Sequence, residues 1–173
     1  MKYIINTNKI TPEFSFDKQV NQHRKDTLSI ILDKPEHWFM MGYFVGDGWI
    51  QDTEKADGRL CHTIRFAINN KDERDIVDSI SQVLPITDKR NDTGKCKKFG
   101  CSDFIWYNIL KQFGKYAHGK LIPEWVQDAP TEFVEQFVEG YKRADGCIKK
   151  SGATSFTTVS YDLNGMPMAP GLF

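Results

Sequence analysis

The sequence has no excess of charge of either sign, because 23 Lys and Arg residues balance 23 Asp and Glu residues. A net charge of zero argues against a broad nucleic-acid-binding surface, which normally carries extra Lys and Arg. No apolar run is long enough to span a membrane, and the N-terminus carries no apolar signal segment. These absences predict an intracellular protein with no secretion or membrane signal.

Cysteine is also scarce, with four residues and no C-x-x-C pair among them. That spacing argues against a zinc site and predicts free thiols. The four histidines are scattered, so a nuclease motif of the His-Asn-His type is absent. Hydrophobic residues make up 40% of the chain and aromatic residues 13%, which is typical of a globular protein. A chain of 173 residues can bury a core as one compact unit or as two small halves.

One short segment occurs twice in the chain. Residues 38–50 (WFMMGYFVGDGWI) return 98 positions later as residues 136–148 (QFVEGYKRADGCI), and six of the 13 aligned pairs are identical. The only carboxylate that both copies share is Asp47 in the first and Asp145 in the second. The repeat predicts pseudo-two-fold symmetry with one acid in each half.

Both copies place small residues four positions apart on a short apolar segment. These are Gly42 and Gly46 in the first copy and Gly140 and Ala144 in the second. Small residues at this spacing let two helix backbones approach closely. The first copy is apolar nearly all round, which indicates a helix buried on several sides. We therefore expect the two helices to pair through these four residues.

The helical part of each copy ends in Asp-Gly, where Gly48 and Gly146 suit the left-handed position that follows a helix. The acids therefore fall in the last turn, where the helix dipole disfavours a carboxylate. If the helices pair, the carboxylates meet, and at about 4 Å they repel by roughly 4 kcal/mol at an effective dielectric near 20. A divalent cation offsets both penalties, and oxygen ligands favour Mg²⁺ or Mn²⁺ over zinc.

Metal-bound carboxylate pairs are a common device for phosphodiester hydrolysis, because the ion activates water and stabilises the leaving oxygen. The alternative is that Asp47-Gly48 and Asp145-Gly146 are ordinary turn residues. The shared 13-residue context argues against that alternative.

The two copies resemble the paired motif of the LAGLIDADG homing endonucleases, aligned over residues 40–48 and 138–146. Three further segments resemble that family: residues 64–72 (IRFAINNKD), 118–125 (HGKLIPEW) and 155–163 (SFTTVSYDL), the last as written in intein-borne members. The resemblance implies an α+β fold with an α-β-β-α-β-β-α half and paired motif helices at the interface. It also implies metal-dependent cleavage of double-stranded DNA.

The resemblance further implies a set of active-site residues. By this alignment Asp47 and Asp145 hold Mg²⁺ or Mn²⁺, and Lys120 polarises water or phosphate. Asn70 takes a solvent-ordering position that the family often fills with Gln, and Ser160 is its counterpart in the second half. Asn at that position departs from the family pattern.

Two strands, about 49–55 and 60–69, are expected to form a hairpin that turns at Asp57-Gly58. Apolar and polar residues alternate along them, so one face belongs to the core and the other is free for the major groove. The DNA contacts predicted on this hairpin are Gln51, Thr53, Lys55, Thr63 and Arg65. Lys89 and Lys97, from the Lys- and Arg-rich residues 89–98, are predicted to contact DNA as well. A solvated sheet face without a partner has the same alternation and is the alternative.

The chain divides into three predicted segments. Residues 1–34 are an extension packed on the core and broken at Thr11-Pro12, residues 35–129 form the first half, and residues 130–173 form a truncated second half. The other expected elements of the two halves are a motif helix over 35–47, a helix over 71–84, strands over 86–90 and 95–101, a helix over 103–113, and a second motif helix opened by Pro130.

The leading hypothesis is a site-specific double-stranded DNA endonuclease, either free-standing or part of an intein. The second is a catalytically impaired remnant that binds nucleic acid, or a maturase that binds intron RNA. The third is a structural protein with a duplicated helix. The first two hypotheses predict a monomer with pseudo-two-fold symmetry, or a chain that requires a complementing fragment.

Overall fold

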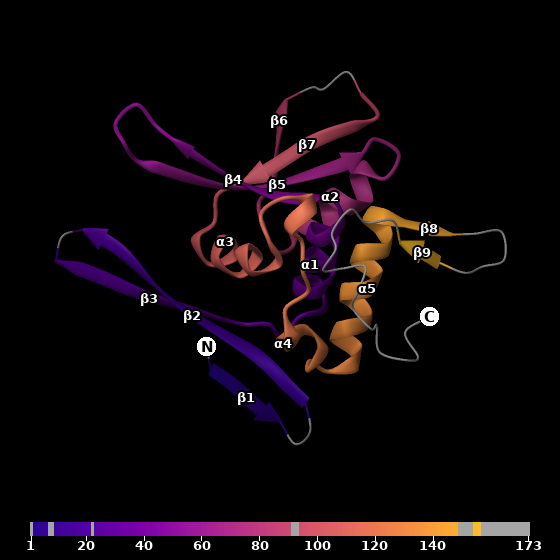
Figure 1. The fold of residues 1–173 in the computed structure, drawn as a ribbon, viewed down its shortest axis with the longest axis horizontal. Helices are drawn as coiled ribbons and strands as arrows, with labels where there is room; N and C mark the ends of the chain where they lie inside the picture. Colours follow the sequence, from indigo (N-terminus) through magenta and orange to yellow (C-terminus); the bar gives the residue numbers. More distant parts are fainter. Residues whose placement is uncertain (1, 7–8, 22, 91–93, 149–153, 157–173) are drawn as a thin grey trace.

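The computed structural model describes residues 2–6, 9–21, 23–90, 94–148 and 154–156 (Figure 1). The main elements are β1 (Lys2–Asn6), β2 (Lys9–Asn21), β3 (Arg24–Ile31), α1 (Pro35–Asp47), β4 (Gly48–Glu54), β5 (Leu60–Asn69), α2 (Glu73–Ser81), β6 (Thr87–Arg90), β7 (Cys96–Cys101), α3 (Phe104–Leu110), α4 (Glu124–Gln127), α5 (Thr131–Asp145), β8 (Gly146–Ile148) and β9 (Thr154–Phe156). Short 3₁₀ turns cover Lys111–Phe113 and Ala117–Gly119. The order α1-β4-β5-α2-β6-β7-α3 is the α-β-β-α-β-β-α order expected of the first half, and the predicted α+β class is confirmed.

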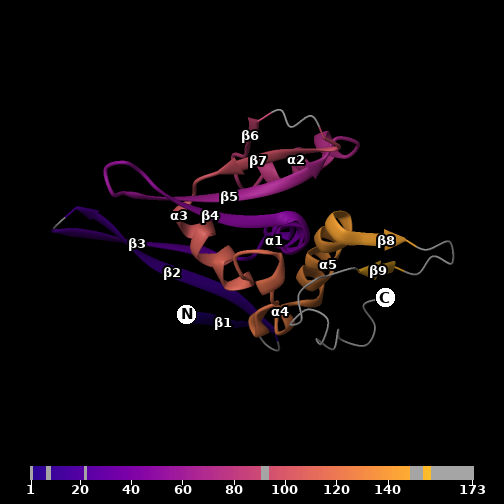
Figure 2. The ribbon, with the colours of Figure 1, turned by 45° about the horizontal axis from the view of Figure 1, so that its top comes forward.

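The centre of the fold is a four-stranded antiparallel sheet with the order β4-β5-β7-β6. Helices α1, α2 and α3 lie on one face of this sheet, and no described helix covers the other face (Figures 1 and 2). The covered face carries the core, as the fully buried pair Ile50 and Ile64 shows. Side chains on alternate positions therefore belong to the open face.

Helix α1 has the bounds that the sequence predicts. Pro35 lies in its first turn, where the missing N–H costs nothing, and its apolar residues are buried as expected. The prediction for Gly48 is wrong: its φ is −103° and its ψ is 157°, so it is extended and begins β4 directly. A side chain at Gly48 would collide with Phe44 of the last helical turn, and this contact explains the glycine.

Residues before α1 form a second sheet, with the order β1-β2-β3, on the opposite side of the helices from the first sheet (Figures 1 and 2). The predicted break at Pro12 is wrong, because β2 continues through it. Pro12 is tolerated because its missing N–H falls just beyond the end of the β2–β3 ladder, where its carbonyl accepts from Leu32 N (3.0 Å). Phe14 packs edge-on against Trp125 at 5.1 Å between ring centroids and joins this sheet to the core.

The second motif continues from α5 into the two-stranded hairpin β8–β9, in which Gly146 pairs with Phe156. Ser160 and the Pro- and Gly-rich tail lie outside the described residues. The described cysteines are free, as predicted. No helix of the described part is long and apolar enough to cross a membrane.

Candidate active site

Helices α1 and α5 pack side by side through the predicted small residues (Figure 2). A Cβ atom at Gly42 would collide with the carbonyl oxygen of Phe137, and one at Gly140 would collide with that of Phe39. The two contacts mirror each other, because each glycine lies against the backbone of the partner helix at the equivalent place. This part of the interface has the two-fold pseudosymmetry that the repeat predicts.

The second pair of small residues lies nearer the C-terminal ends of the helices. A Cβ atom at Gly46 would collide with the Cβ of Ala144 and lie 3.4 Å from the carboxyl carbon of Asp145. Asp47 and Asp145 are the last residues of α1 and α5 and are partly buried. The pairing therefore places both acids at one end of the helix pair.

Burial raises the pKa of Asp47 to about 7, and the negative charge of Asp145 adds to the rise. Burial also raises the pKa of Asp145. The two carboxyls therefore titrate as a pair. Near neutral pH, ionising the second carboxyl while the first is charged costs free energy.

This donor set fits a hard divalent cation. Mg²⁺ in proteins usually takes one or two carboxylates and completes its octahedral shell with water and substrate phosphate oxygens. The described residues include no cluster of three or more His, Cys, Asp and Glu side chains, which a closed zinc site would need. Asp47 and Asp145 are therefore suited to hold Mg²⁺ or Mn²⁺ between the two helix ends.

Lys120 lies in the loop after α3, as expected, but it is only 2% exposed. Its ammonium donates to the carbonyl oxygen of Phe44 at 2.8 Å and lies over the ring of the same residue. Burial lowers the pKa of this amine well below its ordinary value. Lys120 therefore caps the last turn of α1, the turn that ends on Asp47.

Asn70 directly follows the last residue of β5. Its side-chain amide donates to the carbonyl oxygen of Gly94 at 3.2 Å, and its backbone N–H donates to that of Lys95. These contacts anchor the segment that leads into β7. The solvent-ordering role implied by the resemblance stays a prediction, as does that of Ser160.

The open face of the sheet carries several of the predicted DNA contacts. Gln51 and Thr53 of β4, and Lys55 just after it, are exposed. Thr63 and Arg65 of β5 are half-buried and occupy the same face, because Thr63 pairs with Gln51 in the β4–β5 register. The expected alternation along this hairpin is therefore present in the structure.

Lys97 departs from the expected arrangement. It pairs with Ile68, a core residue, and its ammonium forms an ion pair with Glu73 of α2 at 2.8 Å. Both observations place Lys97 on the helix-covered side of the sheet. The neighbouring Lys98 pairs with Ala67 and occupies the open face instead. Lys89 lies in β6, and its side chain is outside the described part.

Trp49 is a further open-face residue that the sequence prediction missed. It pairs with Arg65, is partly exposed, and stands between the buried Gly48 and Ile50. The signal that could have identified Trp49 is its place in the strand, because neighbours in a strand face opposite sides and Ile50 faces the core. The side chain of Arg65 crosses β7 at Gly100, where a Cβ atom would lie 2.8 Å from Arg65 Cδ. Arg65 Nε is buried there without a hydrogen-bond partner among the described residues.

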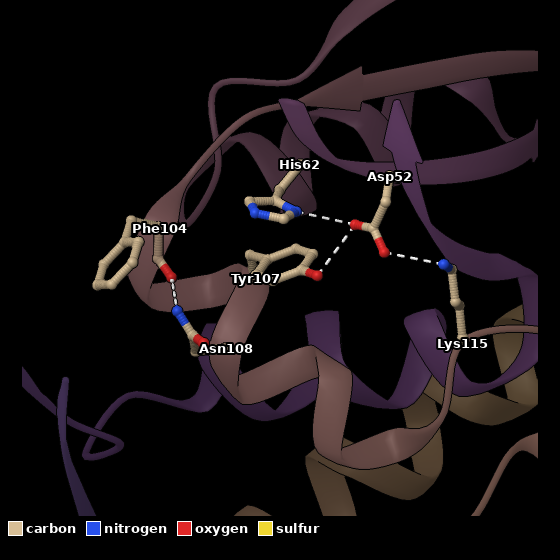
Figure 3. A network of polar contacts seen from close by, with 6 residues as sticks. All are labelled: Asp52, His62, Phe104, Tyr107, Asn108 and Lys115. Carbon is tan, nitrogen blue, oxygen red and sulfur yellow. Dashed lines mark hydrogen bonds and ion pairs between the residues drawn. The ribbon is translucent and has the colours of Figure 1, made fainter. Parts of the chain in front are cut away.

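Four polar side chains meet on the covered face of the β4–β5 hairpin, and we refer to them as the Asp52 cluster (Figure 3). Asp52 Oδ1 accepts from His62 Nδ1 at 2.9 Å and from the Tyr107 hydroxyl at 3.0 Å. Asp52 Oδ2 accepts from Lys115 Nζ at 2.8 Å. Hydrogen bonds from Lys115 and His62 hold the pKa of Asp52 well below its usual range, so this carboxylate stays ionised.

Neither a protein-family model nor a curated protein sequence matches this chain. Similar solved structures are LAGLIDADG homing endonucleases bound to DNA. The I-DmoI complex with DNA and Mn has 11% sequence identity and a TM-score of 0.49, and the match covers 65% of this chain and 63% of that chain. The I-AabMI meganuclease on uncleaved DNA has 14% identity and a TM-score of 0.43, covering 66% of this chain and 58% of that chain.

The I-LtrWI homing endonuclease bound to target DNA has 11% identity and a TM-score of 0.42, covering 69% of this chain and 64% of that chain. The matched region thus spans less than two thirds of each of these proteins. The similarity is one of fold alone, and what this chain does depends on its own residues.

Proposed function

We propose that this protein is a metal-dependent endonuclease that cleaves double-stranded DNA at the paired ends of α1 and α5. The observation that carries the proposal is the pair of partly buried acids, Asp47 and Asp145. They lie together at the ends of α1 and α5, where the chain passes from α1 into β4 of the open-faced sheet. A duplex bound on that face lies beside the acid pair.

In this mechanism Asp47 and Asp145 are the residues that hold the ion. Bound Mg²⁺ or Mn²⁺ supplies charge that activates water and stabilises the leaving oxygen. The rigid helix contacts fix the separation of the carboxylates before the ion arrives, so little reorganisation is needed. Lys120 holds the last turn of α1 through the Phe44 carbonyl and places a donor within that turn.

Binding is assigned to the open face of β4, β5 and β7. An antiparallel hairpin fits the major groove, where Arg reads guanine, Gln reads adenine and the Thr methyl contacts thymine. Arg65 supports this assignment further, because its buried Nε lacks a partner among the described residues, and an unmet buried donor typically costs about 1–3 kcal/mol. A phosphate or base acceptor would satisfy it once the guanidinium turns away from Gly100. Trp49 and Lys98 join the predicted Gln51 and Thr53 on this surface.

Cleavage is tested by incubating the protein with a library of long duplex sites, with Mg²⁺ and with EDTA. We expect cleaved product only with the metal, and none from Asp47→Asn or Asp145→Asn. Asp78→Asn is the matched control, because Asp78 is an exposed carboxylate on α2, away from the acid pair. Product formed equally well by the Asp47→Asn variant would reject the assigned active site.

Binding is tested separately by the fluorescence of Trp49. The other three tryptophans, Trp38, Trp106 and Trp125, are at most 5% exposed, so iodide quenches mainly Trp49. Duplex bound to the open face should protect Trp49 from iodide, and the Trp49→Phe variant should lack this response. Binding that leaves the quenching of Trp49 unchanged would place the DNA elsewhere.

The second candidate is a nucleic-acid-binding protein without catalysis, the remnant or maturase of the sequence hypotheses. The observation that favours it is the main-chain contact of Lys120, which already serves as a helix cap. This candidate predicts equal affinity in Mg²⁺ and EDTA and no cleaved product. Protection of Trp49 by structured RNA rather than by duplex DNA would select the maturase.

A further inference from the structure

The loop that carries Lys120 is closed at its base and exposed along its length. It begins at Gly114, whose φ of 88° and tight approach to the Gly119 carbonyl both require glycine. Leu121 N donates to the Phe113 carbonyl at 3.1 Å and joins the two ends. Residues 115–119 are all exposed, so packing does little to hold the loop in place.

Lys115 attaches this loop to the central sheet at two points. Its carbonyl accepts from the backbone N–H of Ile50 at 3.2 Å, and its ammonium donates to Asp52 at 2.8 Å. Ile50 and Asp52 both belong to β4, the strand that begins immediately after Asp47. The two contacts therefore attach the loop to β4, the strand that directly follows Asp47 in the chain.

The carboxylate of Asp52 is itself held from two other elements. His62 comes from β5 and Tyr107 from α3, and their rings are in contact, tilted by 30° with 4.3 Å between centroids (Figure 3). Tyr107 is buried and donates to Asp52 Oδ1, which leaves Oδ2 oriented toward Lys115. Because donors from β5, α3 and the loop all bind this carboxylate, it is well suited to hold the loop at a fixed position on β4.

We infer that Asp52 is a positioning residue for Lys120: through Lys115 it fixes the loop 114–120 on β4 and so fixes the Lys120 amine at the end of α1. The inference rests on the proposed nuclease function for its kinetic consequence. Asp52 lies on the covered face, whereas its neighbours Gln51 and Thr53 lie on the open face. Loss of the Asp52 charge should therefore lower turnover and leave DNA binding intact.

The test compares Asp52→Asn with Asp57→Asn, a control in the same hairpin whose carboxylate binds only the nearby Arg59 among the contacts described. A displacement of about 1 Å in a supporting group typically costs on the order of 100-fold in rate. We expect kcat of Asp52→Asn to fall by roughly 10- to 100-fold, with the affinity for duplex DNA in EDTA within about twofold of wild type. Asp57→Asn should change neither.

A second readout does not depend on cleavage. The buried Lys120 amine should react slowly with an acylating reagent, as read by peptide mass, and Asp52→Asn should speed its labelling while leaving that of the exposed Lys71 unchanged. A Lys115→Met variant should have the same effect, and combining it with Asp52→Asn should add little. The inference fails if Lys120 labelling is unchanged, or if DNA affinity falls in parallel with kcat.

These outcomes separate the inference from the proposed function. If the wild-type protein cleaves no duplex, the nuclease proposal fails, and faster Lys120 labelling in Asp52→Asn still supports the positional role. If the wild type cleaves and Asp52→Asn cleaves equally well, the nuclease proposal stands and Asp52 has no positioning role.

Discussion

Replacing Asp47 by Asn should stabilise the protein in the absence of metal. The pKa of Asp47 is about 7 in the folded chain against 3.8 for an ordinary aspartate, because of burial and the charge of Asp145. A rise of about three units corresponds to at most ~4 kcal/mol. The site is partly solvated, which screens the repulsion, so we expect about half of that value, or ~2 kcal/mol.

The pH dependence has a definite sign. A carboxyl whose pKa is raised by folding carries no penalty below the unfolded value near 4, and the penalty grows until the pH passes the folded value near 7. Asp47→Asn should therefore match the wild type near pH 4 and exceed its free energy of unfolding by about 2 kcal/mol near pH 8.

Urea unfolding in EDTA at both pH values measures the difference, with Asp78→Asn as the control for loss of an exposed charge. Adding Mg²⁺ should stabilise the wild type at pH 8 and leave Asp47→Asn almost unchanged, because binding to the folded state alone raises stability. A variant that is no more stable than the wild type at pH 8, or a gap that does not vary with pH, would refute the reasoning.

Three further outcomes are expected. Gly140→Ala should destabilise the protein by about 1–3 kcal/mol in thermal or urea unfolding, because its methyl group meets the Phe39 carbonyl, and should also abolish the Mg²⁺ response. Burial lowers the pKa of His37, so the unfolded chain takes up the proton first, and stability should fall as the pH drops below about 6.5. His37→Phe, which keeps the ring contact with Trp106, should flatten that acid limb. Arg65→Ala should weaken duplex binding and, if Arg65 meets a phosphate, reduce the slope of log affinity against log salt by about 0.9.

The sequence predicted the elements whose ends are marked by local chemistry. Pro35 and the Asp47-Gly48 pair delimit α1, and Asp57-Gly58 marks the β4–β5 turn, where Gly58 has a φ of 76°. The small-residue spacing also predicted which faces of the two helices meet. These signals are short-range, so a linear reading can detect them.

The sequence did not predict features that depend on contacts between distant segments. Tyr107 lies 55 residues from Asp52 and Lys115 lies 63 residues from it, and no local pattern indicates that they meet. Lys97 and Lys98 are adjacent and alike, so only the pairing of β7 with β5 decides which one reaches the open face. The sequence did not predict the N-terminal strands, although Phe14 and Phe16 alternate with polar residues, because the Thr11-Pro12 pair indicates a break that β2 does not have.

The two kinds of contact between α1 and α5 carry different evolutionary constraints. Gly42 and Gly140 each face a backbone carbonyl, so no substitution elsewhere can make room for a side chain, and both positions should remain glycine in any functional descendant. Gly46 faces the Cβ of Ala144, and that methyl group can be exchanged between the helices. A lineage can therefore pass from Gly46 with Ala144 to the reverse arrangement only if the Ala144→Gly step comes first.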